Sequence, residues 1–216
     1  MMNKIKVFIL LLIMPFSGLA QITVGPKVGV NLATQFKSDY SVPKTGLVYG
    51  GAINIPIVSS ISVHGELLVS QKGYKEVYKG DTIFDELTAS YLEIPVLAKY
   101  TFDNVNFDFY GMGGVCWSYW TKGSYKSSID GDNIIYEDYK FQTDYDLDGY
   151  KDNRNDFGLV VEAGVAYDNL GSGIITLGIR YTHGLLQTNN HQNPPADLVL
   201  KKNKVLSISL TYFMFL

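Results

Sequence analysis

Alternate aspartates form the pattern with the clearest chemical meaning in this chain. The first, third, fifth, sixth, seventh and ninth positions of one turn are occupied by Asp144, Asp146, Asp148, Gly149, Tyr150 and Asp152. Carboxylate oxygens at this spacing, with the carbonyl of the tyrosine, can wrap around Ca²⁺. The twelfth position, a bidentate glutamate in a complete loop of this type, is Asn155. We therefore predict an incomplete EF-hand-like calcium site, with Ca²⁺ as the one cofactor; the alternative is a solvated acidic loop.

Charged residues recur on the polar side of several strand-like segments. The set is Lys27, Glu66, Glu93, Lys99, Asp108, Glu162 and Arg180. If this side is enclosed, opposite charges on it must pair, because an unpaired buried charge is costly. The set then has two interpretations: the lining of a selective small pore, or a salt-bridged plug that holds the fold together.

The histidines give no comparable signal for catalysis. A hydrolase would need His64, His183 or His191 beside a serine nucleophile and a carboxylate, and no spacing in the chain requires this. We therefore predict that the protein is not an enzyme and has no catalytic residues.

Eight segments, most of them ten residues or longer, place apolar residues at alternate positions. They are 22–32, 45–57, 61–72, 91–100, 105–120, 157–168, 175–182 and 204–216. In the first, Ile22, Val24 and Val28 lie on one side, whereas Thr23 and Lys27 lie on the other. Bacterial outer-membrane barrels have an even number of strands. We therefore predict an all-β fold, the eight-stranded antiparallel up-and-down barrel that spans the outer membrane.

The connections between these segments alternate between long and short. Three joins are brief, at 58–60, 103–104 and 168–173, whereas the longest connection is an expected external loop at 121–156. Short periplasmic turns and long external loops are the rule for bacterial outer-membrane barrels. A soluble barrel with an apolar interior is the alternative. Charged strand residues share a face with most strand glycines, which favours the membrane barrel with a narrow lumen.

Two further features refine the expected strands. Aromatic residues gather toward strand ends on the apolar side, where interfacial girdles lie. They are Tyr49, Tyr100, Trp117, Tyr119, Tyr167, Tyr181 and Tyr212. Pro95 cannot donate a hydrogen bond to a neighbouring strand, so we expect a β-bulge there.

The beginning of the chain predicts export. Lys4 and Lys6 precede an apolar run at 7–16 and small residues before Gln21. The run is shorter than the about 20 apolar residues that a spanning helix needs. We predict a signal peptide at 1–20, cleaved after Ala20, and one mature domain at 21–216. The mature part has 16 basic and 21 acidic residues, a formal net charge of −5, which gives no support for nucleic-acid binding.

Four sequence blocks resemble the small outer-membrane β-barrel proteins of the Bacteroidetes, often labelled porin-family or PorT-like. The blocks are VGPKVGVNLAT (24–34), YLEIPVLAKY (91–100), FYGMGGV (109–115) and KVLSISLTYFMFL (204–216). Such chains usually end on a phenylalanine read by the barrel assembly machinery, whereas this one ends on Phe215 and Leu216.

The resemblance implies two partners, outer-membrane lipid and the barrel assembly machinery. It does not specify a role. We expect a monomer with a structural or binding role, whose external loops meet an unidentified extracellular ligand. Two alternatives are a narrow porin for small solutes and a component of a secretion or surface-assembly apparatus.

Overall fold

The computed structural model describes residues 21–34, 41–78, 83–129, 133–142, 150–168, 171, 173–187, 189–191 and 202–216. The regular elements of these ranges are all β-strands. No helix in them is long and apolar enough to cross a membrane. The predicted signal peptide at 1–20 lies outside the described residues.

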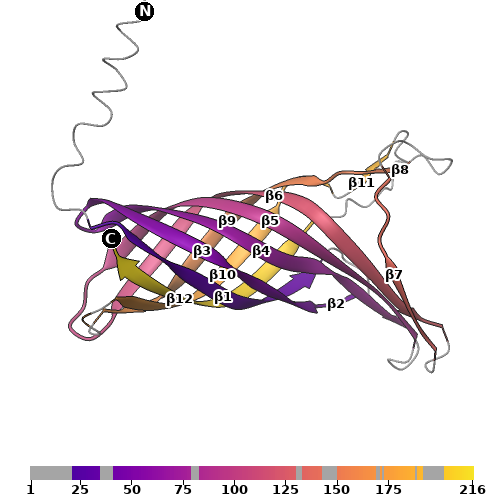
Figure 1. The fold of residues 1–216 in the computed structure, drawn as a ribbon, viewed down its shortest axis with the longest axis horizontal. Coiled ribbons are helices and arrows are strands. Elements are labelled where there is room, and N and C mark those ends of the chain that lie inside the picture. Colours follow the sequence, from indigo (N-terminus) through magenta and orange to yellow (C-terminus); the bar gives the residue numbers. More distant parts are fainter. Residues whose placement is uncertain are drawn as a thin grey trace, which may run out of the picture.

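Eight antiparallel strands close into a barrel (Figure 1). They are β1 (Thr23–Thr34), β3 (Lys44–Val58), β4 (Ile61–Tyr78), β5 (Ile83–Phe102), β6 (Asp108–Ser128), β9 (Asn155–Tyr167), β10 (Ile174–Gly184) and β12 (Lys204–Phe215). Neighbours in the chain pair with each other, and β1 pairs with β12 to close the ring. The predicted fold class is confirmed.

Four short strands lie beyond the barrel wall. The strand β2 (Ser41–Val42) pairs with β4, β7 (Ile134–Asp138) pairs with β6, and β8 (Tyr150–Asp152) pairs with β11 (Asn189–His191). Figure 1 shows them at the end of the barrel opposite the beginning of β1 and the C-terminus. Because long connections lie outside the cell in such barrels, this end is the external one.

The strand register sets the width of the barrel. Starting at Lys204 on β12, successive paired residues lead through Leu159 and Gly65 to Val24, which pairs with Met214. The path therefore returns to β12 ten residues further along. This stagger over eight strands tilts them by about 40° and gives a backbone radius of about 8 Å. Such a lumen is only wide enough for side chains to fill.

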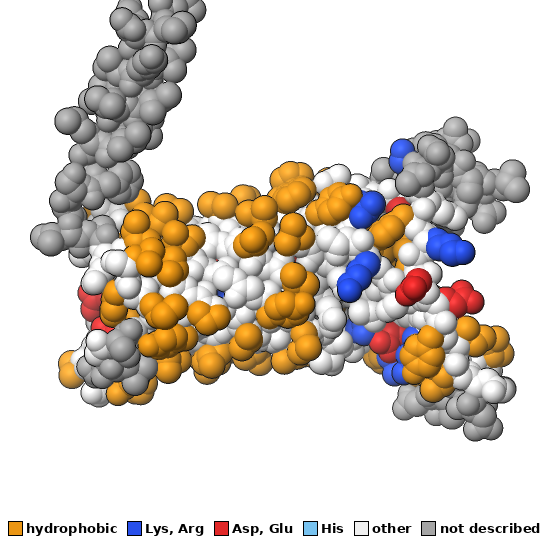
Figure 2. All heavy atoms as spheres, in the orientation of Figure 1, with side chains coloured by type: hydrophobic (Ala, Val, Ile, Leu, Met, Phe, Trp, Pro, Cys, Tyr) orange, Lys and Arg blue, Asp and Glu red, His pale blue; other side chains and the backbone are white. Residues whose placement is uncertain are grey.

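The two-residue period of the strands separates an apolar outer face from a polar lumen. On β12, Leu206, Ile208 and Leu210 are exposed, whereas Ser207 and Ser209 are buried. Exposed apolar side chains lie on all eight barrel strands and form an apolar belt, of which Figure 2 shows one face. On β6 the belt runs from Phe109 to Tyr119, which corresponds to about 25 Å along the barrel axis.

The strands continue further out of the membrane than the sequence predicted. The expected external loop at 121–156 begins inside β6, which runs to Ser128 and then pairs with β7. Likewise β4 and β5 pair from Ile61–Tyr100 up to Tyr78–Ile83. Backbone pairing between adjacent strands continues without lipid, so the end of the apolar pattern does not mark the end of the strand.

The expected bulge at Pro95 is wrong. Pro95 faces Cys116 in an unshifted register with β6, and the register with β4 is the same on both sides of the proline. The pairing of β5 with β6 instead has its register shift between Ser90 and Tyr91, where β6 has the extra residue Thr121, and β3 has another between Pro56 and Val58. The hydroxyl of Thr121 donates to the Ser90 carbonyl at 2.8 Å. The missing N–H of the proline is therefore accommodated without a change of register.

Candidate functional site

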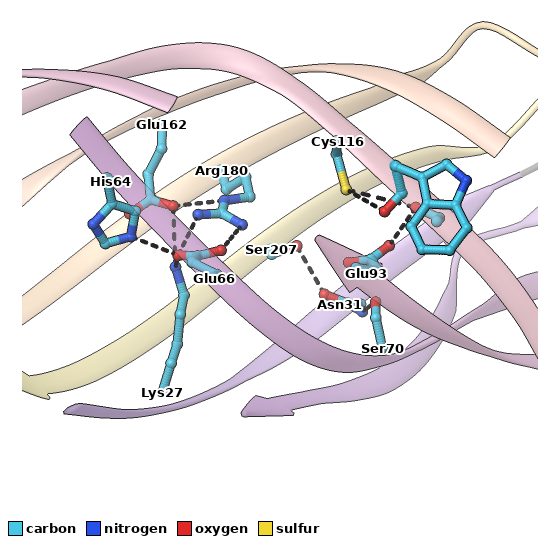
Figure 3. Close-up of polar contacts among 12 residues, drawn as sticks. Lys27, Asn31, His64, Glu66, Ser70, Glu93, Cys116, Glu162, Arg180 and Ser207 are labelled. Carbon is cyan, nitrogen blue, oxygen red and sulfur yellow. Dashed lines mark hydrogen bonds and ion pairs between the residues drawn. The ribbon is translucent and has the colours of Figure 1, made fainter. Parts of the chain in front are cut away.

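A cluster of four charged side chains fills the middle of the lumen (Figure 3). Arg180 donates to both oxygens of Glu66, at 2.6 and 2.8 Å, and its Nε donates to Glu162 at 2.6 Å. The Lys27 Nζ lies 2.8 Å from Glu66 and 3.2 Å from Glu162. The Glu66 side chain is 0% exposed. Two cations and two carboxylates thus cancel in a site closed to solvent, and we call these four residues the central cluster.

Two further residues complete the hydrogen bonds of the central cluster. The His64 Nε2 lies 2.9 Å from Glu66, which as a carboxylate accepts a hydrogen bond from the imidazole N–H. The Tyr110 hydroxyl donates to Glu162 at 2.9 Å. Each buried carboxylate therefore has several donors, which is the condition for burying a charge at tolerable cost.

Two features of the strands position this cluster: the register, which aligns its residues, and two glycines, which leave space for a neighbouring side chain. Arg180 and Glu162 are directly paired residues on β10 and β9, and both point inward. A Cβ at Gly164 or Gly178 would lie 2.5 Å from the Tyr110 hydroxyl. Glycine at these positions therefore makes room for the Tyr110 side chain.

A second polar layer lies closer to the external end. Lys72 forms an ion pair with Glu93, which also accepts from Ser118 at 3.3 Å. The Lys72 Nζ lies 4.8 Å from the centre of the Tyr91 ring. Between this layer and the central cluster, Asn31 donates to Ser70 at 2.9 Å and accepts from Ser207 at 2.8 Å.

The free space between the two polar layers is small. A cavity lined by Lys27, Asn31, Lys72, Glu93 and Arg180 has a volume of about 10 Å³. One water molecule needs about 10–15 Å³ of such space. The lumen at this depth is therefore filled by side chains.

Six of the seven charged residues predicted for the lumen lie inside it, at three different levels. Lys27, Glu66, Glu162 and Arg180 meet in the central cluster and Glu93 lies in the second layer. Lys99 lies below the central cluster with its Nζ 4.7 Å from the centre of the Tyr110 ring. The exception, Asp108, lies at the periplasmic rim, where its Oδ1 accepts from the Asn104 N–H at 3.1 Å.

The predicted calcium site falls mainly on residues whose structure is not described. The range 143–149, which holds three of its aspartates, and the Tyr150 side chain lie outside the described residues. Asp152 is described, and it accepts from the Tyr139 hydroxyl and from the Gln142 N–H, each at 2.9 Å. Within the described ranges no group of three or more His, Cys, Asp or Glu is arranged to hold a metal. The calcium site stays a prediction.

An aromatic cluster lies at the external end. The Trp120 ring stacks on Tyr139 with the centroids 5.0 Å apart and meets the edge of Phe141 at 4.9 Å. It also stacks on Tyr91 at 6.0 Å. The guanidinium of Arg154 lies 4.2 Å from the Phe141 centroid. This cluster joins the barrel mouth to the segment that follows β7.

Residues 17–190 match the sequence profile of the family described as "Outer membrane protein beta-barrel domain". The chain belongs to this family. As a barrel of this outer-membrane family, it lies in the outer membrane with its apolar belt in contact with lipid.

Solved structures similar to this family member include three outer-membrane proteins. Neisserial surface protein A is 14% identical, with a TM-score of 0.48, over 90% of this chain and 97% of that one. OprG of Pseudomonas aeruginosa is 13% identical, with a TM-score of 0.44, over 91% and 95%. Ail of Yersinia pestis, solved with the heparin analogue sucrose octasulfate, is 11% identical, with a TM-score of 0.43, over 90% and 99%. No curated protein matches the chain by sequence.

Sequence reasoning missed two groups of residues in this outer-membrane barrel. Lys72 and Tyr110 lie on the predicted polar face, so the two-residue period could have included them in the lumen set. No pattern in the sequence predicts the contacts of Tyr139 and Phe141 with Trp120. They form because the external part of the chain folds back onto the end of the barrel.

Proposed function

We propose that this outer-membrane barrel is a non-enzymatic binding protein displayed on the cell surface. Its binding element is the sheet formed by the external parts of β4, β5 and β6 together with β7, which we call the external ribbon. The observation that carries this proposal is the exposed edge of the ribbon at β7.

The external ribbon is built as a stable structure with an exposed apolar edge. Its inner side is supported by buried Leu87, Ala89 and Tyr91, packed with Trp120. All five residues of β7 are exposed, and Tyr136 is 70% exposed. The outer side of β7 pairs with no other strand among the described residues, and an extended binding partner can use the apolar and aromatic side chains of such an edge.

The filled lumen favours this role over a porin. A solute would have to pass the central cluster and the Lys72–Glu93 layer, and the cavity between them has a volume of only about 10 Å³. Displacing these side chains would separate ion pairs buried in a low-dielectric site, which costs several kcal/mol. We therefore expect no steady ion channel.

The calcium prediction fits the same proposal. Asp152 accepts a hydrogen bond from Tyr139 in the aromatic cluster beneath the ribbon. An ion held by Asp144, Asp146 and Asp148 with Asp152 would fix the external loop beside this cluster. Calcium would then order the binding surface rather than take part in a reaction.

Binding by displayed protein tests the proposal. The chain is expressed in the outer membrane of a laboratory bacterium, and the cells are applied to arrays of immobilised glycans and extracellular proteins. The variant I135S/Y136S removes two exposed β7 side chains, and V105S removes an even more exposed one at the periplasmic end. We expect at least one array ligand whose binding falls about tenfold or more in I135S/Y136S. V105S should bind as the wild type does.

Planar-bilayer conductance of the refolded mature chain provides the second measurement. An unboiled sample that migrates faster than a boiled one on a gel shows that the barrel is folded. We expect no discrete channels from this folded protein. Steady channels, or a ligand bound equally well by I135S/Y136S, would contradict the proposed role of the ribbon.

A further inference from the structure

The outer border of the apolar belt can be located from the strand register. With strands tilted by about 40°, one residue along a strand changes the height by about 2.5 Å and one step to the next strand changes it by about 3 Å. The register then puts Lys204 within about 2 Å of the height of Tyr119 and Phe157, the last outward aromatics of β6 and β9. Arg154 and Lys122 lie about 5 to 8 Å above that level.

Three cations therefore lie at the height where headgroups of the outer leaflet begin. Lys122 and Lys204 are exposed, and Arg154 is half-buried. Among the described residues none of the three has a carboxylate within 4.0 Å. His183 stands directly opposite Lys204 in the pairing of β10 with β12. We call Lys122, Arg154 and Lys204 the cationic border.

Arg154 is held in a fixed orientation at this border. Its Nε donates to the Trp120 carbonyl at 2.9 Å and its Nη2 donates to the Thr121 carbonyl at 3.3 Å. Its guanidinium lies 4.6 Å from the centre of the Tyr119 ring and 4.2 Å from that of Phe141. A guanidinium that is already ordered loses little entropy when it pairs with a phosphate, whose geometry matches its fork of donors.

The opposite border of the belt has the opposite charge. The turns and strand ends there include Asp103, Asp108 and Asp168, of which Asp103 and Asp168 are exposed and Asp108 lies at an inward position of the rim. The described residues 54–62, 99–108, 167–168, 173–175 and 211–216 at this end include one cation, Lys99, which points into the lumen, so none of their outward positions is Lys or Arg. Figure 2 shows Lys and Arg side chains adjoining the external end of the apolar belt, with acidic ones further out at that end and also at the periplasmic end. The cations thus mark one leaflet.

We propose that the cationic border binds the phosphate groups of an anionic glycolipid in the outer leaflet. The acyl chains of that lipid lie against the apolar belt, and its phosphates reach Arg154 and Lys204. Near a negatively charged membrane surface each Lys or Arg contributes favourably to such binding, whereas carboxylates would repel the lipid. Arg154 and Lys204, the two residues that reach the phosphates, lie outside the strands of the external ribbon, so the inference does not depend on the proposed binding function.

Titration of the folded mature protein with diphosphorylated lipid A tests this inference. The protein is kept in a neutral detergent, and bound lipid is counted by native mass spectrometry. The variant R154Q/K204Q removes two charges from the border. The matched variant K75Q/K126Q removes two from the ribbon, where both lysines lie about 5 Å from the Phe84 ring. We expect roughly 30-fold weaker binding in R154Q/K204Q and little change in K75Q/K126Q.

Two ligand controls identify the source of the phosphate. Dephosphorylated lipid A should bind the wild-type protein about as weakly as lipid A binds R154Q/K204Q. Inorganic phosphate at the same concentration should not displace lipid A. The inference is overturned if dephosphorylated lipid A binds equally well, if inorganic phosphate displaces the lipid, or if the two double variants lose the same affinity. A gel shift on heating confirms that each variant is folded.

Discussion

Removing the charge of Glu66 should destabilise the barrel far more than removing an outer carboxylate. Glu66 accepts two hydrogen bonds from Arg180, one from Lys27 and one from His64. In Glu66→Gln, two buried cations share one remaining carboxylate, Glu162. Breaking a buried ion pair from one side costs about 3–5 kcal/mol. At about 1.4 kcal/mol per tenfold, the folding equilibrium should shift by a factor between about one hundred and a few thousand.

The measurement is urea unfolding of the protein in phospholipid vesicles, followed by the fluorescence of its two tryptophans. Glu86→Gln is the matched control, because Glu86 pairs with Lys44 at 2.6 Å outside the lumen and should cost about 1 kcal/mol or less. When Lys27→Met is added to Glu66→Gln, the central cluster again has equal numbers of cations and carboxylates, namely Arg180 and Glu162. We therefore expect the double variant to recover part of the lost stability. The reasoning is refuted if Glu66→Gln costs no more than the control, or if Lys27→Met adds to the loss.

Three other predictions concern the lipid face, the external loop and the aromatic cluster. Ile179→Arg should cost about 2–4 kcal/mol of unfolding free energy in vesicles and Ile179→Ala much less, because this exposed side chain faces lipid near mid-height; equal losses would contradict the assignment of faces. Replacing Asp146 and Asp148 with Asn should abolish calcium-dependent protection of the external loop from protease, and a wild type without such protection would contradict the site. Burial and the hydrogen bond to Asp152 raise the pKa of Tyr139 above 10.0, so this tyrosine should stabilise the fold below pH 10 and lose that effect as the pH rises further; Tyr139→Phe should remove the corresponding step from an ultraviolet titration of tyrosinate.

The transmembrane part of the fold could be predicted from the sequence because lipid imposes a strict rule on it. Outward positions such as Ile208 and Leu210 must be apolar, and the alternate positions line a lumen that is filled by their side chains. Lys27, Glu66, Glu162 and Arg180 could be assigned to that lumen for the same reason. Which of them pair depends on the register of strands far apart in the sequence, and the two-residue period does not contain that information.

The external part could not be predicted because no comparable rule applies there. Beyond the membrane both polar and apolar residues, such as Lys126 and Tyr125, are compatible with a hydrated strand. The alternation of apolar and polar residues therefore ends, although β6 stays hydrogen-bonded to β5 as far as Ser128. The bulge at Ser90 and Tyr91 was missed, and one was wrongly expected at Pro95, for a related reason. A proline shows that one donor is missing, but the pairing around it decides whether the register must shift.

The ion pairs of the central cluster also bear on how the barrel folds. Arg180 and Glu66 are 114 residues apart, and Lys27 and Glu162 are 135 apart, so each bond joins strands from different parts of the chain. In an open sheet that had not yet closed between β1 and β12, these charges would face either water or hydrocarbon, with their partners still distant. Insertion into lipid before closure would therefore leave charges unpaired at membrane depth, which is costly. This cost makes closure and insertion a single cooperative event and disfavours half-assembled intermediates in the bilayer.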